Sequence, residues 1–229
     1  MFYVLSLGGS IVAPPEGVDV NFLRKFKKLV ESRVEKGDRF IIVVGGGGIA
    51  RDYVKNAFKV NKEVSVINKD YIGIFATRLN AFLVKSIFAE NAYKDLILDP
   101  NIKIKTNKPL IFSGGYEPGN SSDYVAVLLA ETYGIKEVIN LSNIDYIYDK
   151  DPSKFSDAKK IEKINWNDFL DIIGREWVPG LNVPFDPVAS LRCQKKGKKV
   201  VAINGRNLKN LENYLLGKNF KGTEIFDDF

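Results

Sequence analysis

Glycine clusters that directly follow short apolar runs are the most constraining feature of this chain. They occur at residues 7–10, 44–48, 113–115 and 203–205. The first three precede a predicted helix start, so backbone N–H groups and the positive end of a helix dipole can face the same anion. One glycine loop also makes an ordinary turn, but three in the first half of one chain predict that several phosphates are bound together. The pattern therefore favours phosphoryl transfer between two phosphorylated small molecules.

Strand-like and helix-like segments alternate along most of the chain. Strands are predicted at residues 2–7, 39–44, 96–98, 109–112, 137–141, 146–148, 199–203 and 222–225. Helices are predicted inside the 45–48 glycine run and at residues 21–36, 69–91, 123–133, 165–173, 187–196 and 207–216, with a loop at 177–186. Such regular alternation predicts an α/β fold around a mainly parallel sheet. The 229 residues predict one large domain.

The complete absence of histidine narrows the possible chemistry. It excludes Ser-His-Asp and Cys-His catalysis and histidine-ligated zinc, and it leaves carboxylates, lysine, arginine, backbone amides and oxygen-bound Mg²⁺. The single cysteine, Cys193, excludes an internal disulfide and a cysteine-rich metal site, and we predict no metal held by protein side chains alone. We expect Cys193 to be a packing residue on a helix.

Charge and hydropathy limit the classes of molecule that this chain is expected to bind. The net charge of +6 favours anionic ligands, but basic and acidic residues are interleaved, which predicts a solvated surface and no nucleic-acid partner. No apolar run approaches the ~20 residues of a membrane span. The N-terminal residues lack the basic and cleavable apolar parts of a signal peptide. We therefore predict a cytoplasmic protein with no membrane partner.

Two familiar nucleotide motifs fit the glycine loops poorly. Gly45-x-Gly47-x-x-Ala50 matches the dinucleotide fingerprint, but Glu63 precedes the next apolar segment, residues 64–67, where an acidic residue should end it. No glycine loop carries the Lys-Ser/Thr ending of a P-loop. Neither class of nucleotide-binding protein is therefore favoured.

Polar residues near the second and third loops allow both a structural and a ligand-binding role. Arg51 follows the second loop by one helical turn, so it can contact a phosphate or lie on the helix surface. Asp70 can cap a long helix or accept a ribose hydroxyl. Ser121, Ser122 and Asp123 can cap a helix while their hydroxyls and carboxylate still face an anion.

A later segment offers groups suited to a purine and its ribose. Ser142 follows the strand at residues 137–141, and Tyr148 and Asp151 come shortly after it. The same residues can also be a core tyrosine and a plain Asp-Pro turn. The sequence alone leaves both interpretations open.

In order and spacing these segments resemble the amino-acid-kinase family and, within it, the UMP kinases of the archaeal type. The resemblance extends from about residue 4 to residue 225. The matching segments are residues 7–10, 44–51, 70–74, 77–81, 114–119, 123–126, 142–152, 157–161, 186–189 and 222–225. The resemblance implies a three-layer α/β/α sandwich with a mainly parallel central sheet.

The resemblance also implies the ligands and their residues. UMP would bind to an N-terminal lobe of about residues 1–135, and ATP to a C-terminal lobe of about residues 136–229 of one domain. The UMP-binding residues would be Gly46, Asp70, Tyr116, Glu117, Pro118, Gly119, Asn120, Ser121 and Ser122. The ATP-binding residues would be Gly8, Gly9, Ser10, Gly47, Arg51, Ser142, Tyr148 and Asp151. A homo-oligomer, a hexamer by resemblance, is implied as well.

The implied reaction needs no histidine, because the attacking group is already a phosphate anion. Catalysis would consist of in-line positioning and neutralisation of charge on the transferred phosphoryl group, with Mg²⁺ arriving with ATP. Arg51 would bridge phosphates, Asp123 would organise the site, and the catalytic cation would lie near Arg192. The related isopentenyl phosphate kinases use a histidine, which this chain lacks.

Two lysines of the family pattern are missing. Ser6 stands before the first Gly-Gly, as it commonly does in archaeal-type UMP kinases, and Leu191 stands next to Arg192. By analogy with the loss of one electrostatic donor, each change removes roughly 2.7–4 kcal/mol of transition-state stabilisation. Arg192, Lys195 or Arg175 can replace the charge, although a helical step from 191 to 192 turns the side chain by ~100°.

Three functional hypotheses follow. The first is a UMP kinase. The second is a family member that binds nucleotide without transferring phosphate, motivated by Leu191, Tyr146 and the apolar segment 177–185. The third is a kinase for another small phosphate or carboxylate.

Overall fold

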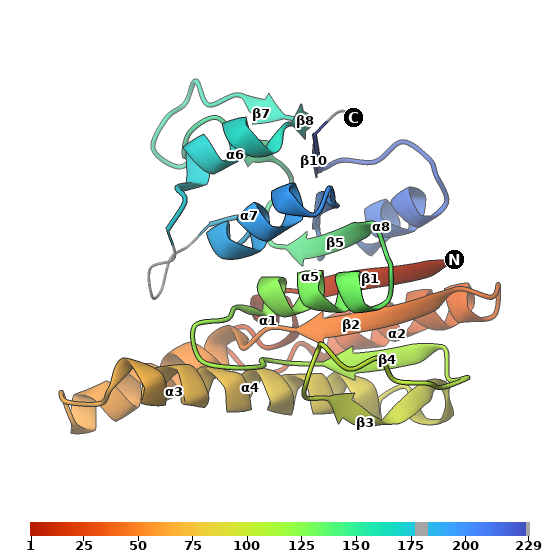
Figure 1. Ribbon diagram of the computed structural model, residues 1–229, viewed down its shortest axis with the longest axis horizontal. Coiled ribbons are helices and arrows are strands. Elements are labelled where there is room, and N and C mark those ends of the chain that lie inside the picture. Colours follow the sequence, from red (N-terminus) through yellow and green to blue (C-terminus); the bar gives the residue numbers. More distant parts are fainter. Residues whose placement is uncertain (177–182, 228–229) are drawn as a thin grey trace.

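The computed structural model describes residues 1–176 and 183–227, and it is a three-layer sandwich with helices on both faces of one long sheet (Figure 1). The strands are β1 (Phe2–Leu7), β2 (Arg39–Val44), β3 (Ala92–Ile97), β4 (Leu110–Ser113), β5 (Glu137–Ser142), β6 (Ile147–Tyr148), β7 (Lys160–Ile161), β8 (Lys163–Ile164), β9 (Lys199–Asn204) and β10 (Thr223–Ile225). The helices are α1 (Gly9–Val12), α2 (Val20–Val34), α3 (Gly47–Val60), α4 (Val66–Ser86), the 3₁₀ turn η1 (Ala89–Asn91), α5 (Ser122–Thr132), α6 (Trp166–Ile173), α7 (Pro187–Lys195) and α8 (Leu208–Leu215).

The sheet runs through both halves of the chain in the order β3-β4-β2-β1-β5-β9-β10-β8. The pairs from β3 to β9 are parallel, and β10 is antiparallel to β9. The short strands β6 and β7 form a separate antiparallel ribbon. The expected α/β/α fold with a mainly parallel sheet is therefore confirmed.

Two apolar layers hold the sandwich together, one on each face of the sheet. Strand β2 reads Arg-Phe-Ile-Ile-Val-Val, and its alternate side chains enter opposite layers, so both faces are buried. Helices α2, α4 and α8 pack on one face, and α5, α6 and α7 pack on the other. Parallel strands covered on both sides bring all their carboxyl ends to one edge, where the glycine loops lie.

The structure corrects several predicted boundaries. Helix α4 begins at Val66, because the Ser65 hydroxyl accepts a hydrogen bond from the Asn68 backbone and caps the helix three residues before the predicted start. Strand β3 spans Ala92–Ile97, longer than the predicted 96–98. The short strands β7 and β8 were not predicted. Most of the predicted loop at 177–186 lies outside the described residues.

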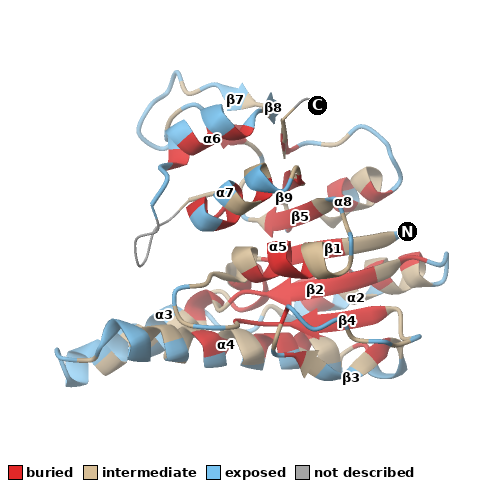
Figure 2. Cartoon of the chain, in the orientation of Figure 1, coloured by how far each residue is buried: buried red, intermediate tan, exposed pale blue. Residues whose placement is uncertain are grey.

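Helices α3 and α4 extend beyond the sheet as a hairpin, which Figure 1 shows at the lower left. Helix α4 is apolar on two opposite sides. Ile74, Ala81 and Val84 are buried, whereas Phe75 and Leu79 are 64% and 60% exposed. Figure 2 shows that the hairpin carries most of its exposed surface away from the sheet. None of the described helices has both the length and the hydropathy that crossing a membrane requires.

The first two glycine loops touch each other through their backbones. A Cβ atom added at Gly9 would overlap the backbone of Gly45 and Gly47, and one at Gly47 would overlap the Gly9 carbonyl. Gly47 also has φ of +62°, which side chains rarely adopt. The close approach of the two loops therefore depends on glycine at these positions.

We expect Gly9→Ala to lower the free energy of unfolding by about 1–3 kcal/mol or more, because a methyl group there overlaps fixed backbone. Gly73→Ala in α4 is the matched control. Nothing lies within 4 Å of its added Cβ, so helix propensity should raise stability by about 0.5–1 kcal/mol. Chemical denaturation measures both, and equal effects would contradict the packing argument.

Candidate active site

The carboxyl ends of the central strands bring the glycine loops together. Leu7 of β1 is in register with Val44 of β2, and Val43 is in register with Ser113 of β4. The Gly45 backbone N–H donates to the Leu7 carbonyl at 2.9 Å, and the Gly8 N–H donates to the Leu141 carbonyl at 2.8 Å. Three loops distant in sequence thus become one continuous rim.

Three side chains of α4 hold the second and third loops in place. Asn80 is buried, and its amide donates to the carbonyls of Gly45 at 2.9 Å and Gly46 at 3.0 Å. Thr77 accepts the Gly115 N–H at 2.6 Å. Asn80 and Thr77 therefore fix the backbones of the second and third loops from the α4 side.

Arg78 completes this support from α4. Its guanidinium donates to the carbonyls of Gly115 at 3.0 Å and Tyr116 at 3.1 Å. The sequence analysis assigned no role to Thr77, Arg78 or Asn80, although residues 77–81 were one of the matching segments. Only tertiary contacts reveal that these polar side chains support the loops.

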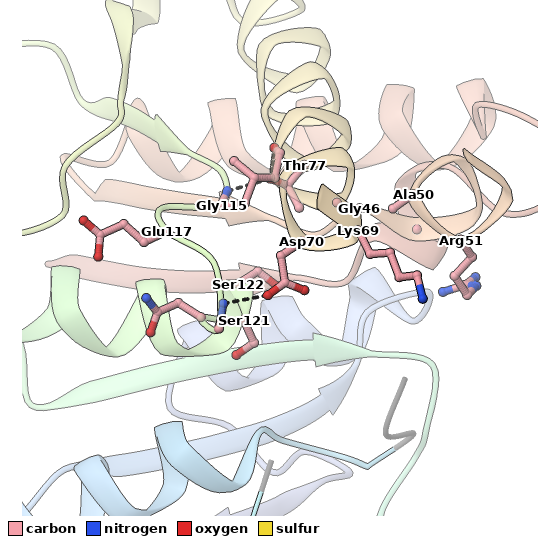
Figure 3. Close-up of a pocket in the computed structure, with 15 residues that line it drawn as sticks. Gly46, Ala50, Arg51, Lys69, Asp70, Thr77, Gly115, Glu117, Ser121 and Ser122 are labelled. Atoms are coloured by element: carbon pink, nitrogen blue, oxygen red, sulfur yellow. Dashed lines mark hydrogen bonds between the residues drawn. The ribbon is translucent and has the colours of Figure 1, made fainter. Parts of the chain in front are cut away.

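A cavity of about 280 Å³ opens between these loops and the first turns of α3 and α4. Its lining residues are Gly46, Gly47, Ala50, Arg51, Lys69, Asp70, Gly73, Ile74, Thr77, Gly115, Glu117, Gly119, Asn120, Ser121 and Ser122. Figure 3 shows Asp70 at the centre, where its carboxylate accepts the Gly119 N–H at 2.8 Å. Asp70 therefore ties α4 to the third loop and does not cap α4, whose cap is Ser65.

Most residues of the predicted UMP set share this cavity. They are Gly46, Asp70, Glu117, Gly119, Asn120, Ser121 and Ser122. Gly47 and Arg51 of the predicted ATP set line the same space. Tyr116 and Pro118 are not among the lining residues. Lys69 lines the cavity although the sequence analysis did not select it, because a lysine on a helix carries no signal of its own there.

The rest of the predicted ATP set lies along the same edge or beyond it. Gly8 precedes α1, Gly9 and Ser10 begin it, and Ser142 ends β5. The Ser142 hydroxyl is buried and has no hydrogen-bond partner among the described residues. The Gly205 N–H donates to the Ser142 carbonyl at 2.8 Å, so the fourth glycine loop packs beside it.

Tyr148 and Asp151 belong to the β6–β7 ribbon and the turn that follows β6. The Asp151 carboxylate accepts the Ser153 hydroxyl at 2.7 Å and the Ser153 N–H at 2.9 Å. These hydrogen bonds lower the pKa of Asp151 below its usual value. Asp151 thus forms the turn that the sequence analysis gave as the alternative to ribose binding. Its binding to the ribose of a purine nucleotide stays a prediction.

Two carboxylates lie close together where α5 and α7 begin. Ser6 in β1 donates its hydroxyl to Asp123 Oδ1 at 2.7 Å, and the Asp186 N–H donates to Asp123 Oδ2 at 3.3 Å. Asp186 caps α7 by accepting the Ala189 N–H at 2.7 Å. Burial, followed by repulsion from Asp186, raises the pKa of Asp123 to about 6, and burial also raises the pKa of Asp186.

Two of the cations considered as replacements for the missing lysine, Arg192 and Arg175, are held in ion pairs. Arg192 donates to both oxygens of Glu131, at 2.6 and 2.9 Å, and to the Tyr124 hydroxyl at 3.0 Å. Glu131 lies eight residues after Asp123 on α5, about 12 Å along the helix axis. Arg175 pairs with Asp171 at 2.9 Å. A catalytic role for Arg192 stays a prediction, and it requires the guanidinium to leave its ion pair.

Comparison with known proteins identifies the family to which this chain belongs. The sequence profile of the amino acid kinase family matches residues 1–204. The chain belongs to the amino acid kinase family. Within it, uridylate kinases of Thermoplasma acidophilum and Pyrococcus abyssi are 31% and 33% identical to this chain, each covering 98% of it and 96% and 99% of their own length.

Solved structures of the family share the whole architecture. The crystal structure of the Archaeoglobus fulgidus uridylate kinase aligns with a TM-score of 0.83 at 33% identity, covering 98% of this chain and 100% of that one. The Bacillus anthracis UMP kinase aligns with a TM-score of 0.79 at 20% identity, covering 100% of this chain and 96% of that one, which shows the common fold.

The carboxyl pair predicts an unusual pH dependence of stability. The pKa of Asp123 rises from 3.8 to about 6 in the folded chain. The protonated Asp123 carboxyl group therefore contributes fully to the free energy of unfolding below about pH 4. This contribution, about 2–3 kcal/mol, is lost as the pH rises through about 6. The side chain of Asp123→Asn cannot ionise. The stability of this variant relative to the wild type should therefore increase as the pH rises from about 4 to about 6.

Thermal unfolding at several pH values measures this difference. Asp95→Asn, at an exposed position of β3, is the matched control and should follow the wild type. A constant gap between Asp123→Asn and the wild type from about pH 4 to about pH 7 would contradict the burial argument.

Proposed function

We propose that this chain is a uridylate kinase that transfers the γ-phosphoryl group of ATP to UMP and releases ADP and UDP. The carrying observation is the cavity between the second and third glycine loops, in a chain whose uridylate kinase relatives match it over nearly their full length. Glycine backbone, three hydroxyl side chains and two carboxyl side chains are part of its lining, and such groups suit the phosphate and ribose of a nucleoside monophosphate.

In this proposal the two lobes of one domain divide the substrates. UMP occupies the cavity formed by residues 1–135, with the third loop around it. ATP lies along the carboxyl edge of β1, β5 and β9, over residues 136–229, with its phosphates at Gly8, Gly9 and Ser10. The buried, unpartnered hydroxyl of Ser142 lies on that edge and supports the assignment.

The chemistry is a single in-line displacement. An oxygen of the UMP phosphate forms a bond to the γ-phosphorus of ATP, and the bond from that phosphorus to the bridging oxygen of ADP breaks. No proton has to be removed from the attacking phosphate, so no histidine is needed. Arg51 at the rim can approach both phosphates, and Gly46 and Gly47 at the start of α3 can direct N–H groups toward them.

Mg²⁺ fits the residues near Asp123. No group of three or more His, Cys, Asp or Glu side chains that could hold a metal ion occurs in residues 1–176 and 183–227. Asp123 and Asp186 supply the hard oxygen donors that Mg²⁺ prefers. When bound, the ion would reduce the negative charge of the ATP phosphates, and its positive charge would stabilise both carboxylates in their ionised form.

A non-catalytic nucleotide-binding protein is the second candidate, because both family lysines are replaced. Ser6 is bonded to Asp123, and Leu191 is 36% exposed on α7. Neither replacement supplies a charge to the transferred phosphoryl group. This candidate predicts nucleotide binding without turnover.

One assay separates the candidates. With ATP and Mg²⁺, we expect ADP release to depend on UMP and to be much slower with CMP, GMP and AMP. Calorimetry with ATP alone is the control for a correctly folded nucleotide site. Binding of ATP without turnover of any nucleotide would favour the non-catalytic candidate, and turnover of another small phosphate would favour a different kinase.

We also propose that the chain forms a homo-oligomer through α4. Its outward side carries the exposed residues Ile67, Tyr71, Phe75, Leu79 and Phe82. They fall within an arc of about 120°, opposite the stripe buried on the sheet. From their exposed fractions they offer roughly 600 Å² per copy, close to the ~800 Å² per partner of a standard interface.

A second copy is the occupant that this helix fits best. A stripe on one straight helix can pair with its own image in an antiparallel, two-fold arrangement, so each apolar side chain meets another of the same set. The 21 residues of α4 give about 31 Å of contact length. Single exposed apolar residues are common on protein surfaces, whereas a contiguous apolar patch of this size is typical of an interaction site.

The double variant Phe75→Glu, Leu79→Glu tests this interface. We expect it to convert the oligomer to smaller species in light scattering, because four like charges would face each other across the two-fold axis. Ile102→Glu changes an equally exposed residue elsewhere and should leave the assembly unchanged. A wild type that is monomeric, or an unchanged double variant, would contradict the proposal.

A further inference from the structure

The site needs positive charge that its expected residues do not supply. Ser6 and Leu191 are neutral, and Arg192 is paired with Glu131. Arg78 is close to the cavity, but its guanidinium supports the carbonyls of the third loop. Arg51 is therefore the one residue of the predicted catalytic set that places a cation in the cavity lining.

Lys69 places a second cation in the same cavity. It begins the second turn of α4, directly before Asp70, and it lines the cavity with Arg51. Figure 3 draws the ammonium of Lys69 and the guanidinium of Arg51 at the same end of the cavity, pointing toward each other. Neither side chain forms an ion pair with any residue that the structure describes.

Two cations that share one end of a cavity repel each other unless an anion lies between them. Gly46 and Gly47 at the start of α3 lie at this end, so the helix dipole adds further positive potential there. The Asp70 carboxylate lies at the centre of the cavity, where it is bonded to the third loop, and Glu117 of that loop also lines the cavity. The cavity thus has a cationic end suited to phosphate and an acceptor-rich end suited to hydroxyl and amide donors.

The Lys69 side chain of α4 contacts the ring of Phe58 on the neighbouring helix α3. Its ammonium lies 4.4 Å from the centre of the Phe58 ring, and the ammonium of Lys62 lies 4.5 Å from the same ring. Both lysines contact the Phe58 ring and belong to the α3–α4 hairpin, but Lys69 lines the cavity and Lys62 does not. The pair therefore separates a role in the cavity from a role in holding the hairpin.

We propose that Lys69 binds the phosphate of the acceptor nucleotide together with Arg51, and so supplies positive charge that Ser6 and Leu191 do not. Arg51 binds the phosphate from α3 and Lys69 binds it from α4, which fixes the attacking oxygen between the two helices. The proposal rests on the proposed function and adds a residue to it.

The test compares Lys69→Gln with Lys62→Gln and Lys69→Arg. We expect Lys69→Gln to lower kcat/KM for UMP about 10- to 100-fold, mainly through KM for UMP, with little change in KM for ATP. Lys69→Arg keeps the charge and should recover most of the activity. Lys62→Gln should behave as the wild type, and thermal unfolding checks that all variants are folded.

Binding experiments keep this proposal separate from the proposed function. UMP and pyrophosphate titrated by calorimetry into wild type and Lys69→Gln report the phosphate site without turnover. Lower affinity for both in Lys69→Gln supports the role of Lys69, even if the wild type fails to phosphorylate UMP and the proposed function falls. Equal affinities and equal kinetics in Lys69→Gln and Lys62→Gln would overturn the role of Lys69.

Discussion

The contact between the first two glycine loops is the constraint on which the rest of the site depends. Gly9 and Gly47 meet backbone to backbone where β1 and β2 end, at a distance that no side chain could occupy. This contact brings the starts of α1 and α3 to one place, so their N–H groups can face a common anion. Asn80 binds the carbonyls of the second loop from the α4 side.

Charge in the site is arranged at the expense of stability. Asp123 and Asp186 are enclosed near each other, with their pKa values raised, and Arg51 and Lys69 share one end of the cavity. Each like-charged pair is unfavourable in the free protein and becomes favourable when a cation or a phosphate joins it. A site for two polyanions and a divalent cation requires such groups in place before the ligands arrive, which is a common reason for locally reduced stability.

Helix α4 combines three tasks, and its sequence reflects all of them. Its inward side packs on the sheet, its polar residues support the glycine loops, and its outward side is apolar and exposed. An apolar pattern on two opposite sides hides the single stripe that usually marks a surface helix. The sequence analysis predicted that this helix begins at residue 69, whereas the Ser65 cap places its start at Val66.

The sequence by itself determined the α/β class, the alternation of strand and helix segments and the positions of the glycine loops, because apolar periodicity and glycine placement are local properties. It also indicated the family through motif order. Only the tertiary structure decided that Arg192 pairs with Glu131, that Asp70 bonds to Gly119 and that Lys69 lines the cavity. These contacts join elements far apart in the chain, and a charged side chain on a helix carries no local signal of the partner that folding brings to it.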